Sequence, residues 1–210
     1  MWPGPRHGLT LTLASFLTLG TFGCADQSAP PVPRTEALVD PAQITRAGRQ
    51  TPEGVTLQLW RAVQVGDAAS AAGFYDARVL RAIGFDRVSG ALAQQRSQLE
   101  VLRPKDISGA NTALGTEVVV KGENTVAGTR EPTTKVLSFL LRRSPQGWRV
   151  AYDTLLGDAL AAYVYSQVQE RVAPGSNKPT PEAQIAARKI GDLYRGLFSP
   201  SSEQPKARRG

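Results

Sequence analysis

The chain has 210 residues, of which 41% are hydrophobic, and its 25 basic and 18 acidic side chains give a formal net charge of +7. It contains a single cysteine and a single histidine, so an internal disulfide is excluded and the usual ligands of a structural zinc site are missing. The basic residues are scattered along the sequence and form no stripe with interleaved aromatic residues, which argues against a nucleic-acid partner.

The N-terminus has the pattern of an export signal, with a short basic segment at Arg6-His7, an apolar run over residues 9–22, and Gly23 before Cys24. The apolar run is too short for a membrane span, which needs about twenty residues. This pattern resembles the bacterial lipoprotein signal. The resemblance implies a signal peptide over residues 1–23, lipidation of Cys24 with acyl chains such as palmitate, and an anchor on the extracytoplasmic face of the cell membrane. An ordinary secretory signal that happens to contain a cysteine is the alternative.

Residues 24–50 are rich in proline, alanine and polar residues and show no sustained periodicity. The stretch "SAPPVPRTEALVDPAQ" is typical of a linker, so we predict a Pro-rich tether that separates a domain from the membrane. The domain is predicted to open at "TPEG", where Thr51 is a good N-cap, Pro52 suits the first helical position and Glu53 complements the helix N-terminus.

Helical periodicity follows this start signal. The first helix carries an apolar stripe, and Gly66 ends it. Asp67 is placed to cap a second helix rich in alanine, and a third helical stretch is predicted before residue 100. The apolar residues that define these segments are Val55, Leu59, Trp60 and Val63 in the first, Phe74 in the second, and Val88, Leu92 and Leu99 in the third.

From about residue 100 onward the apolar residues recur with a period of two, in runs separated by turn signals of which "SPQG" is the clearest. This pattern predicts an antiparallel meander with one apolar face. Strict alternation turns Asp153 outward together with Arg149. It turns inward Leu137, Phe139, Leu141, Trp148, Val150 and Tyr152.

Two helices are predicted after the sheet. Asp158 can cap the first, which ends at "APGSNKP". Thr180 and the Pro-Glu pair behind it repeat the earlier start signal and open a second helix with Ile190, Leu193 and Leu197 on one face. The predicted segments are thus a domain over residues 51–172, a linker and C-terminal helix over residues 173–198, and a basic, disordered tail over residues 199–210.

The stretches "LWRAVQVGDAASAAGFYDARV", Leu59 to Val79, and "GWRVAYD", Gly147 to Asp153, resemble the nuclear-transport-factor-two-like superfamily. The resemblance implies a cystatin-like α+β cone in which helices lie across the concave face of a curved antiparallel sheet and leave an apolar-walled pocket. Members of that superfamily include isomerases, hydratases, small-molecule or lipid binders and non-enzymatic exported accessory domains.

Candidate pocket residues follow from this resemblance and from the inward positions of the strands. They are Trp60, Phe74, Tyr75, Leu137, Phe139, Trp148 and Tyr152. Asp76 is the one candidate for proton transfer, although its place after the second helix is also typical of a turn or cap residue. No nucleophile elbow, Walker-type loop or EF-hand loop occurs.

We therefore expect a membrane-anchored, non-enzymatic module of the cell envelope that contacts another envelope protein and needs neither a metal nor a cofactor. Two alternatives stay open. One is a binding protein for an apolar or lipid-like small molecule held in the pocket. The other is an isomerase-like enzyme that uses a buried Asp76 with a raised pKa.

Overall fold

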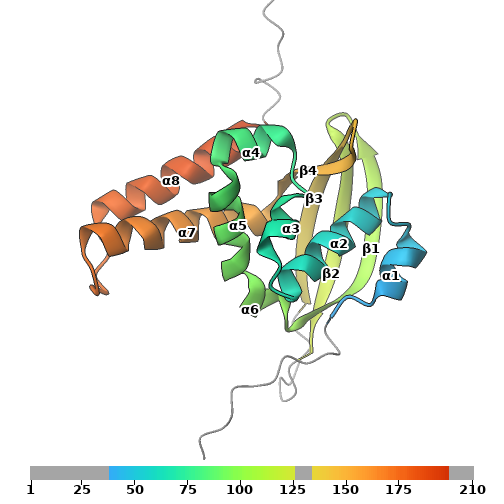
Figure 1. Ribbon diagram of the computed structural model, residues 1–210, viewed down its shortest axis with the longest axis horizontal. Coiled ribbons are helices and arrows are strands. Elements are labelled where there is room, and N and C mark those ends of the chain that lie inside the picture. Colours follow the sequence, from blue (N-terminus) through green and yellow to red (C-terminus); the bar gives the residue numbers. More distant parts are fainter. Residues whose placement is uncertain (1–37, 126–133, 199–210) are drawn as a thin grey trace, which may run out of the picture. The chain divides into compact units, whose positions relative to one another are not determined.

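The computed structural model describes residues 38–125 and 134–198, all of which belong to the second of two compact units, residues 33–210. The described residues have an α+β fold, as the sequence predicts, with helices before and after one antiparallel sheet (Figure 1). The helices before the sheet are α1 (Pro41–Ala47), α2 (Pro52–Gln64), α3 (Ala68–Ala72), α4 (Ala77–Ile83), α5 (Phe85–Gln94) and α6 (Arg96–Leu99). The strands are β1 (Leu102–Thr112), β2 (Gly115–Asn124), β3 (Thr134–Ser144) and β4 (Gly147–Asp153), and they are followed by α7 (Thr154–Val172) and α8 (Pro181–Gly196).

Helix α1 lies within the segment that the sequence predicts as tether. Its N-cap is Asp40, whose carboxylate accepts the Ala42 N–H at 2.8 Å, while the Gln43 side chain accepts the Asp40 N–H at 3.1 Å. Val39 and Ile44 are buried in the same core as the later helices. The domain therefore begins by Val39 and not at Thr51, because prolines that suggest a linker also suit the first turn of a helix. Residues 1–37, with Cys24, and the tail from residue 199 lie outside the described residues.

The predicted start of α2 is confirmed, since Thr51 Oγ1 accepts the Gly54 N–H at 3.1 Å. Asp67 caps α3 in the same way, and its side chain accepts the Ser70 N–H at 3.0 Å. Helix α2 lies across one face of the sheet (Figure 1) and buries its whole apolar stripe there. The predicted third helical stretch is two helices, α5 and α6.

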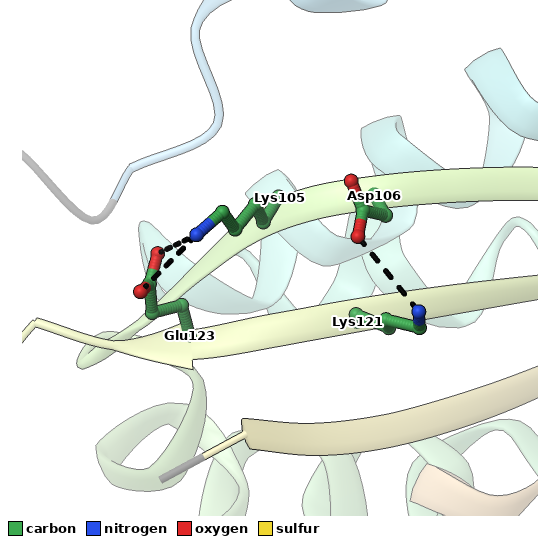
Figure 2. A network of polar contacts seen from close by, with 4 residues as sticks. All are labelled: Lys105, Asp106, Lys121 and Glu123. Carbon is green, nitrogen blue, oxygen red and sulfur yellow. Dashed lines mark hydrogen bonds and ion pairs between the residues drawn. The ribbon is translucent and has the colours of Figure 1, made fainter. Parts of the chain in front are cut away.

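The four strands form a meander in the order β1-β2-β3-β4, with every neighbouring pair antiparallel. The β1–β2 ladder contains a bulge at Lys105. Two ion pairs, one of them made by Lys105 itself, join the strands there (Figure 2). Lys105 lies 3.3 Å from Glu123, and Lys121 lies 3.9 Å from Asp106. All four side chains are solvent-accessible, so each pair contributes at most about 1 kcal/mol to stability.

A second bulge, in β4, overturns part of the predicted alternation. Leu141 pairs with Val150 and Leu140 pairs with Tyr152, so Ala151 is an extra residue in the ladder. Beyond it the two faces exchange: Tyr152 points outward beside Leu140, and Asp153 lies inward opposite Phe139 and is fully buried. The predictions of an inward Tyr152 and an outward Asp153 are therefore wrong.

The C-terminal helices also differ from the prediction in detail. Helix α7 begins directly after the sheet, with Asp153 as its N-cap in place of Asp158. Helix α8 has the predicted Thr180 cap and lies beside α7 (Figure 1). Its buried face contains Ile190 and Tyr194, whereas Leu193, which was predicted to share the apolar face, is 44% exposed.

The side chain of Gln169 holds the connection between α7 and α8. Its Nε2 donates to the carbonyls of Ser176 at 3.2 Å and Lys178 at 2.8 Å. Its Oε1 accepts both the N–H and the hydroxyl of Thr180 at 3.0 Å. The residue that caps α8 is therefore itself fixed by α7, which makes the two helices one helical hairpin.

The close approach between α2 and the turn before it gives a test of the fold. A Cβ atom on Gly54 would lie 1.9 Å from the carbonyl oxygen of Gly48, so Gly54→Ala must displace the turn. We expect this variant to lose roughly 1–3 kcal/mol of unfolding free energy in urea denaturation. The control is Gly191→Ala in α8, where a Cβ meets no atom within 4 Å, and where alanine should stabilise the helix by about 0.5–1 kcal/mol. Equal stability of the two variants would contradict the contact.

Candidate functional site

Four of the candidate pocket residues are packed into the core. Trp60 of α2, Tyr75 before α4, and Leu137 and Phe139 of β3 are each no more than 2% exposed. Gly122 of β2 allows the Trp60 ring to approach the sheet, since a Cβ at that position would lie 3.0 Å from Cη2 of the ring. The inner face of the sheet is thus covered by the chain's own side chains, and none of these four residues lines a described groove.

Tyr152 lies on the opposite face of the sheet from these core residues, because of the bulge in β4. Its ring stacks on the ring of Tyr194 in α8, with centroids 5.1 Å apart and an interplanar angle of 22°. Phe198 packs against both rings, and the guanidinium of Arg142 lies 5.7 Å from the centroid of the Phe198 ring. Tyr152 is therefore part of the attachment of α8 and lies apart from the other candidate residues.

The remaining two candidates, Phe74 and Trp148, meet in a surface groove of about 390 Å³. We call it the arginine groove. Its lining side chains are basic, amide or apolar: Arg49, Arg143 and Arg149; Gln50, Gln58 and Gln146; and Val55, Phe74 and Trp148, with Gly147 between them. Phe74 and Trp148 are both partly exposed there, in contrast to the four buried candidates. The sequence prediction names the two aromatic residues of this groove but none of its arginines.

Three segments far apart in the chain form the arginine groove. The turn from Gly48 to Thr51 supplies one side and is fixed by Gln58 of α2, whose Nε2 donates to the Arg49 carbonyl at 2.8 Å. The chain at Phe74 pairs with the edge of β4: the Val150 N–H donates to the Phe74 carbonyl at 2.9 Å. The β3–β4 hairpin supplies the third side, where Arg143 and Trp148 are cross-strand partners.

A buried carboxylate lies at the other end of β4. Asp153 Oδ1 accepts the Leu156 N–H at 2.6 Å, and Oδ2 accepts the Tyr194 hydroxyl at 3.3 Å. The Tyr194 oxygen in turn accepts the Asp153 N–H at 3.0 Å. Burial raises the pKa of Asp153 from 3.8 to about 6, although these hydrogen bonds lower it in part.

The Tyr75 hydroxyl faces the same region of the core. It has no hydrogen-bond partner of normal geometry, but its burial and the charge of Asp153 raise the pKa of Tyr75 well above the usual value. A carboxyl group with a pKa near neutrality has the acidity for proton transfer. Asp153 is fully buried, however, and its contacts with Leu156 and Tyr194 fix two helices, so its arrangement fits a structural role.

Asp76, the candidate for proton transfer in the sequence, caps a helix. Its Oδ1 accepts the Arg78 N–H at 2.7 Å at the start of α4. The side chain does not line the arginine groove or any of the other grooves described on this part of the chain. Its position matches the cap interpretation of the sequence.

Two further features of the described residues bear on function. Within them, no three Cys, His, Asp or Glu side chains are grouped as metal ligands would be. Also within them, every helix is too short or too polar to cross a membrane. Comparison with protein-family models, curated proteins and solved structures finds no significant match to this chain.

The raised pKa of Asp153 predicts how stability depends on pH. The folded state binds this proton more tightly than the unfolded chain, whose carboxyl pKa is near 3.9. The tighter binding of this proton therefore adds to the free energy of unfolding in full below about pH 4, and the added stability is lost as the pH rises through about 6. In Asp153→Asn the amide keeps the N-cap acceptor but does not titrate. We expect the stability of this variant relative to the wild type to rise by about 2–3 kcal/mol between pH 4 and pH 7.5, measured by urea denaturation.

The other titrating groups cancel in this difference, because both proteins contain them. Asp153→Ala is the control for the cap, since it leaves the Leu156 N–H and the Tyr194 hydroxyl without a partner. It should be less stable than Asp153→Asn by roughly 1–3 kcal/mol at every pH. If the difference in unfolding free energy between the wild type and Asp153→Asn does not change with pH, the pKa of the Asp153 carboxyl group is not raised.

Proposed function

We propose that the protein is an exported lipoprotein, anchored by Cys24 to the extracytoplasmic face of the cell membrane, whose α+β domain is a non-catalytic interaction module of the cell envelope. The observation that supports an interaction module is the filled inner face of the sheet, where Trp60, Leu137 and Phe139 are each no more than 2% exposed. The proposed lipid anchor rests on the sequence pattern that ends at Cys24.

A filled interior favours a partner at the surface over a ligand inside the sheet. A small-molecule site needs a cavity of roughly 300 Å³ or more. The described grooves of that size lie at the surface, between helices or beside strands, and their linings do not include the buried aromatic residues. The packing thus supports the interaction module over the binding of an apolar molecule inside the sheet.

Two carboxylates considered above for proton transfer, Asp76 and Asp153, have structural roles that support a non-catalytic function. Asp76 serves as a helix cap, and the oxygens of Asp153 are used by the N-terminus of α7 and by Tyr194. A general acid or base must reach the substrate within hydrogen-bond distance, directly or through one water. Neither carboxylate lines a described groove in which a substrate could lie.

We further propose that the domain is related to the nuclear-transport-factor-two-like superfamily. The motifs at Leu59–Val79 and Gly147–Asp153 carry this proposal, together with the order of elements, in which helices precede an antiparallel meander. The hairpin of α7 and α8 follows the meander. Exposed apolar side chains on this hairpin, Ile185 and Leu193, offer a surface for a protein partner.

The filled interior can be tested by truncation of one inner side chain. If Leu137 is packed on all sides, Leu137→Ala should lower the unfolding free energy by about 2–5 kcal/mol, since it loses buried contacts and leaves a cavity. Leu193→Ala is the matched control, because it makes the same chemical change at a side chain that is 44% exposed. It should change stability by about 0.5 kcal/mol or less. Similar small losses in both variants would indicate an open interior and would remove the support for an interaction module.

The anchor is tested by Cys24→Ala in a bacterial host. The wild type should be recovered in the membrane fraction, with a mass that shows acyl chains on an N-terminal Cys24. The variant should accumulate as an uncleaved precursor or appear in the soluble fraction, because the acylated residue is gone. Ser28→Ala, a few residues later, is the control and should leave the fractionation unchanged. A Cys24→Ala protein that is processed and membrane-bound like the wild type would contradict the lipoprotein assignment.

A further inference from the structure

The arginine groove carries positive charge that no neighbouring carboxylate balances. Arg49, Arg143 and Arg149 line it, and its lining includes no acidic side chain. On another part of the described surface, Lys105 and Lys121 do have acidic partners across β1 and β2 (Figure 2). Within the described ranges, the ion pairs do not include any of the three arginines of the groove.

The three arginines that line the groove come from segments far apart in the chain. Arg49 comes from the turn before α2, and the two other arginines come from opposite strands of the β3–β4 hairpin. Arg149 Nη1 donates to the Trp148 carbonyl at 2.9 Å, which holds that side chain against the strand edge. Three arginines in one lining without a carboxylate make the groove positive, and this charge attracts an anion.

The groove also offers aromatic surface beside this charge. Phe74 and Trp148 reach it from the two segments that pair at the edge of β4, and both rings are partly exposed. Aromatic faces bind flat or aliphatic groups, whereas guanidinium forks bind oxyanions through two parallel hydrogen bonds. A ligand that matches both features has an oxyanion attached to an apolar body.

Hydrogen bonds fix the backbone that forms the walls of the groove, so a ligand need not order this backbone. The Thr51 hydroxyl shares its one proton between the carbonyl oxygens of Ala47 and Gly48, at 2.7 and 2.8 Å, and Gln58 Nε2 donates to the Arg49 carbonyl. On the opposite side the Asp76 N–H donates to the Val150 carbonyl at 2.8 Å. Sites fixed in this way lose less entropy on binding.

We propose that the arginine groove binds a phosphate ester whose organic group is aromatic or aliphatic. A phosphate carries up to two charges and three acceptor oxygens, so it matches three guanidinium groups better than a carboxylate, which has one charge and two oxygens. The volume of about 390 Å³ suits a small organic molecule. This binding activity does not depend on the anchor at Cys24 or on the filled interior of the sheet. The phosphate monoester is either a soluble molecule or the headgroup of a phospholipid such as phosphatidic acid.

The test uses the full-length chain in a non-ionic detergent, titrated with phenyl phosphate and followed by tryptophan fluorescence. We expect a saturable change that is absent in Trp148→Phe. Arg49→Gln/Arg143→Gln should raise the dissociation constant roughly tenfold or more, because each arginine contributes charge-assisted hydrogen bonds. The matched control, Arg81→Gln/Arg171→Gln, removes the same charge from exposed sites outside the groove. It should change the dissociation constant for phenyl phosphate less than twofold. Inorganic phosphate should bind roughly tenfold more weakly, since it lacks the stacking group.

A second measurement does not depend on the folding of any variant. Saturating phenyl phosphate should protect Arg49 and Arg143 of the wild type, but not Arg81, from modification by phenylglyoxal, as mapped by mass spectrometry. Absence of this protection would overturn the proposal, as would equal weakening of binding in the two double variants. The proposal would also fail if a glutamate-rich peptide bound the groove and phenyl phosphate did not compete with it, since the ligand would then be an acidic protein segment.

Sedimentation with vesicles identifies the source of the phosphate, and Cys24→Ala is added to each of the three proteins so that acyl chains do not retain them. If phosphatidic acid vesicles, whose headgroup is a phosphate monoester, retain the wild type and the Arg81/Arg171 control but not the Arg49/Arg143 variant, and phenyl phosphate releases the protein, the ligand is a phospholipid headgroup. If vesicle binding is the same for all three proteins while phenyl phosphate binding still requires Arg49 and Arg143, the ligand is a soluble phosphate ester. Either result supports the groove as a phosphate site.

Discussion

The buried carboxylate of Asp153 joins the sheet to both C-terminal helices, and the rest of this half of the molecule depends on it. One oxygen caps α7 and the other accepts the hydroxyl of Tyr194 in α8, while the backbone of the same residue pairs with β3. Removing a carboxylate from water costs several kcal/mol, and the pKa near 6 shows that these hydrogen bonds offset only part of that cost. The gain is in geometry, since this one residue sets where β4 ends, where α7 begins and where α8 packs.

The bulge at Ala151 makes this junction possible and also separates the aromatic residues. Without an extra residue, alternation along β4 would turn the Asp153 side chain to the outer face. With it, Tyr152 takes the outer position and stacks on Tyr194, while Trp148 stays at the hairpin end near Phe74. Aromatic residues that one pocket could have shared are thus divided among the core, the attachment of α8 and the arginine groove.

The features that could be predicted from the sequence are those decided by local chemistry. The α+β class, the caps at Thr51, Asp67 and Thr180 and the turn at the β3–β4 hairpin follow from residues close to one another in the chain. The bulge in β4 has no local signal, because the residues around it alternate as a regular strand would. The rotation of α8 depends in turn on the bulge, since Tyr194 faces inward to meet Asp153 and this leaves its neighbour Leu193 exposed.

The arginine groove, too, could be predicted from the sequence only in part, because tertiary structure brings its residues together. Phe74 and Trp148 are identifiable from sequence as aromatic residues near strands, but Arg49 belongs to a segment whose composition suggests a linker. It reaches the groove only because α1 is held to the domain by Val39 and Ile44 and because Gly54 lets the turn approach α2.

The two ends of β4 have separate roles. Asp153 at one end sets the stability and the docking of helices, while Trp148 and its arginine neighbours at the other end remain partly accessible. Because Arg49 and Arg143 make no contact with the hydrogen bonds of Asp153, binding and stability can be altered independently in this fold.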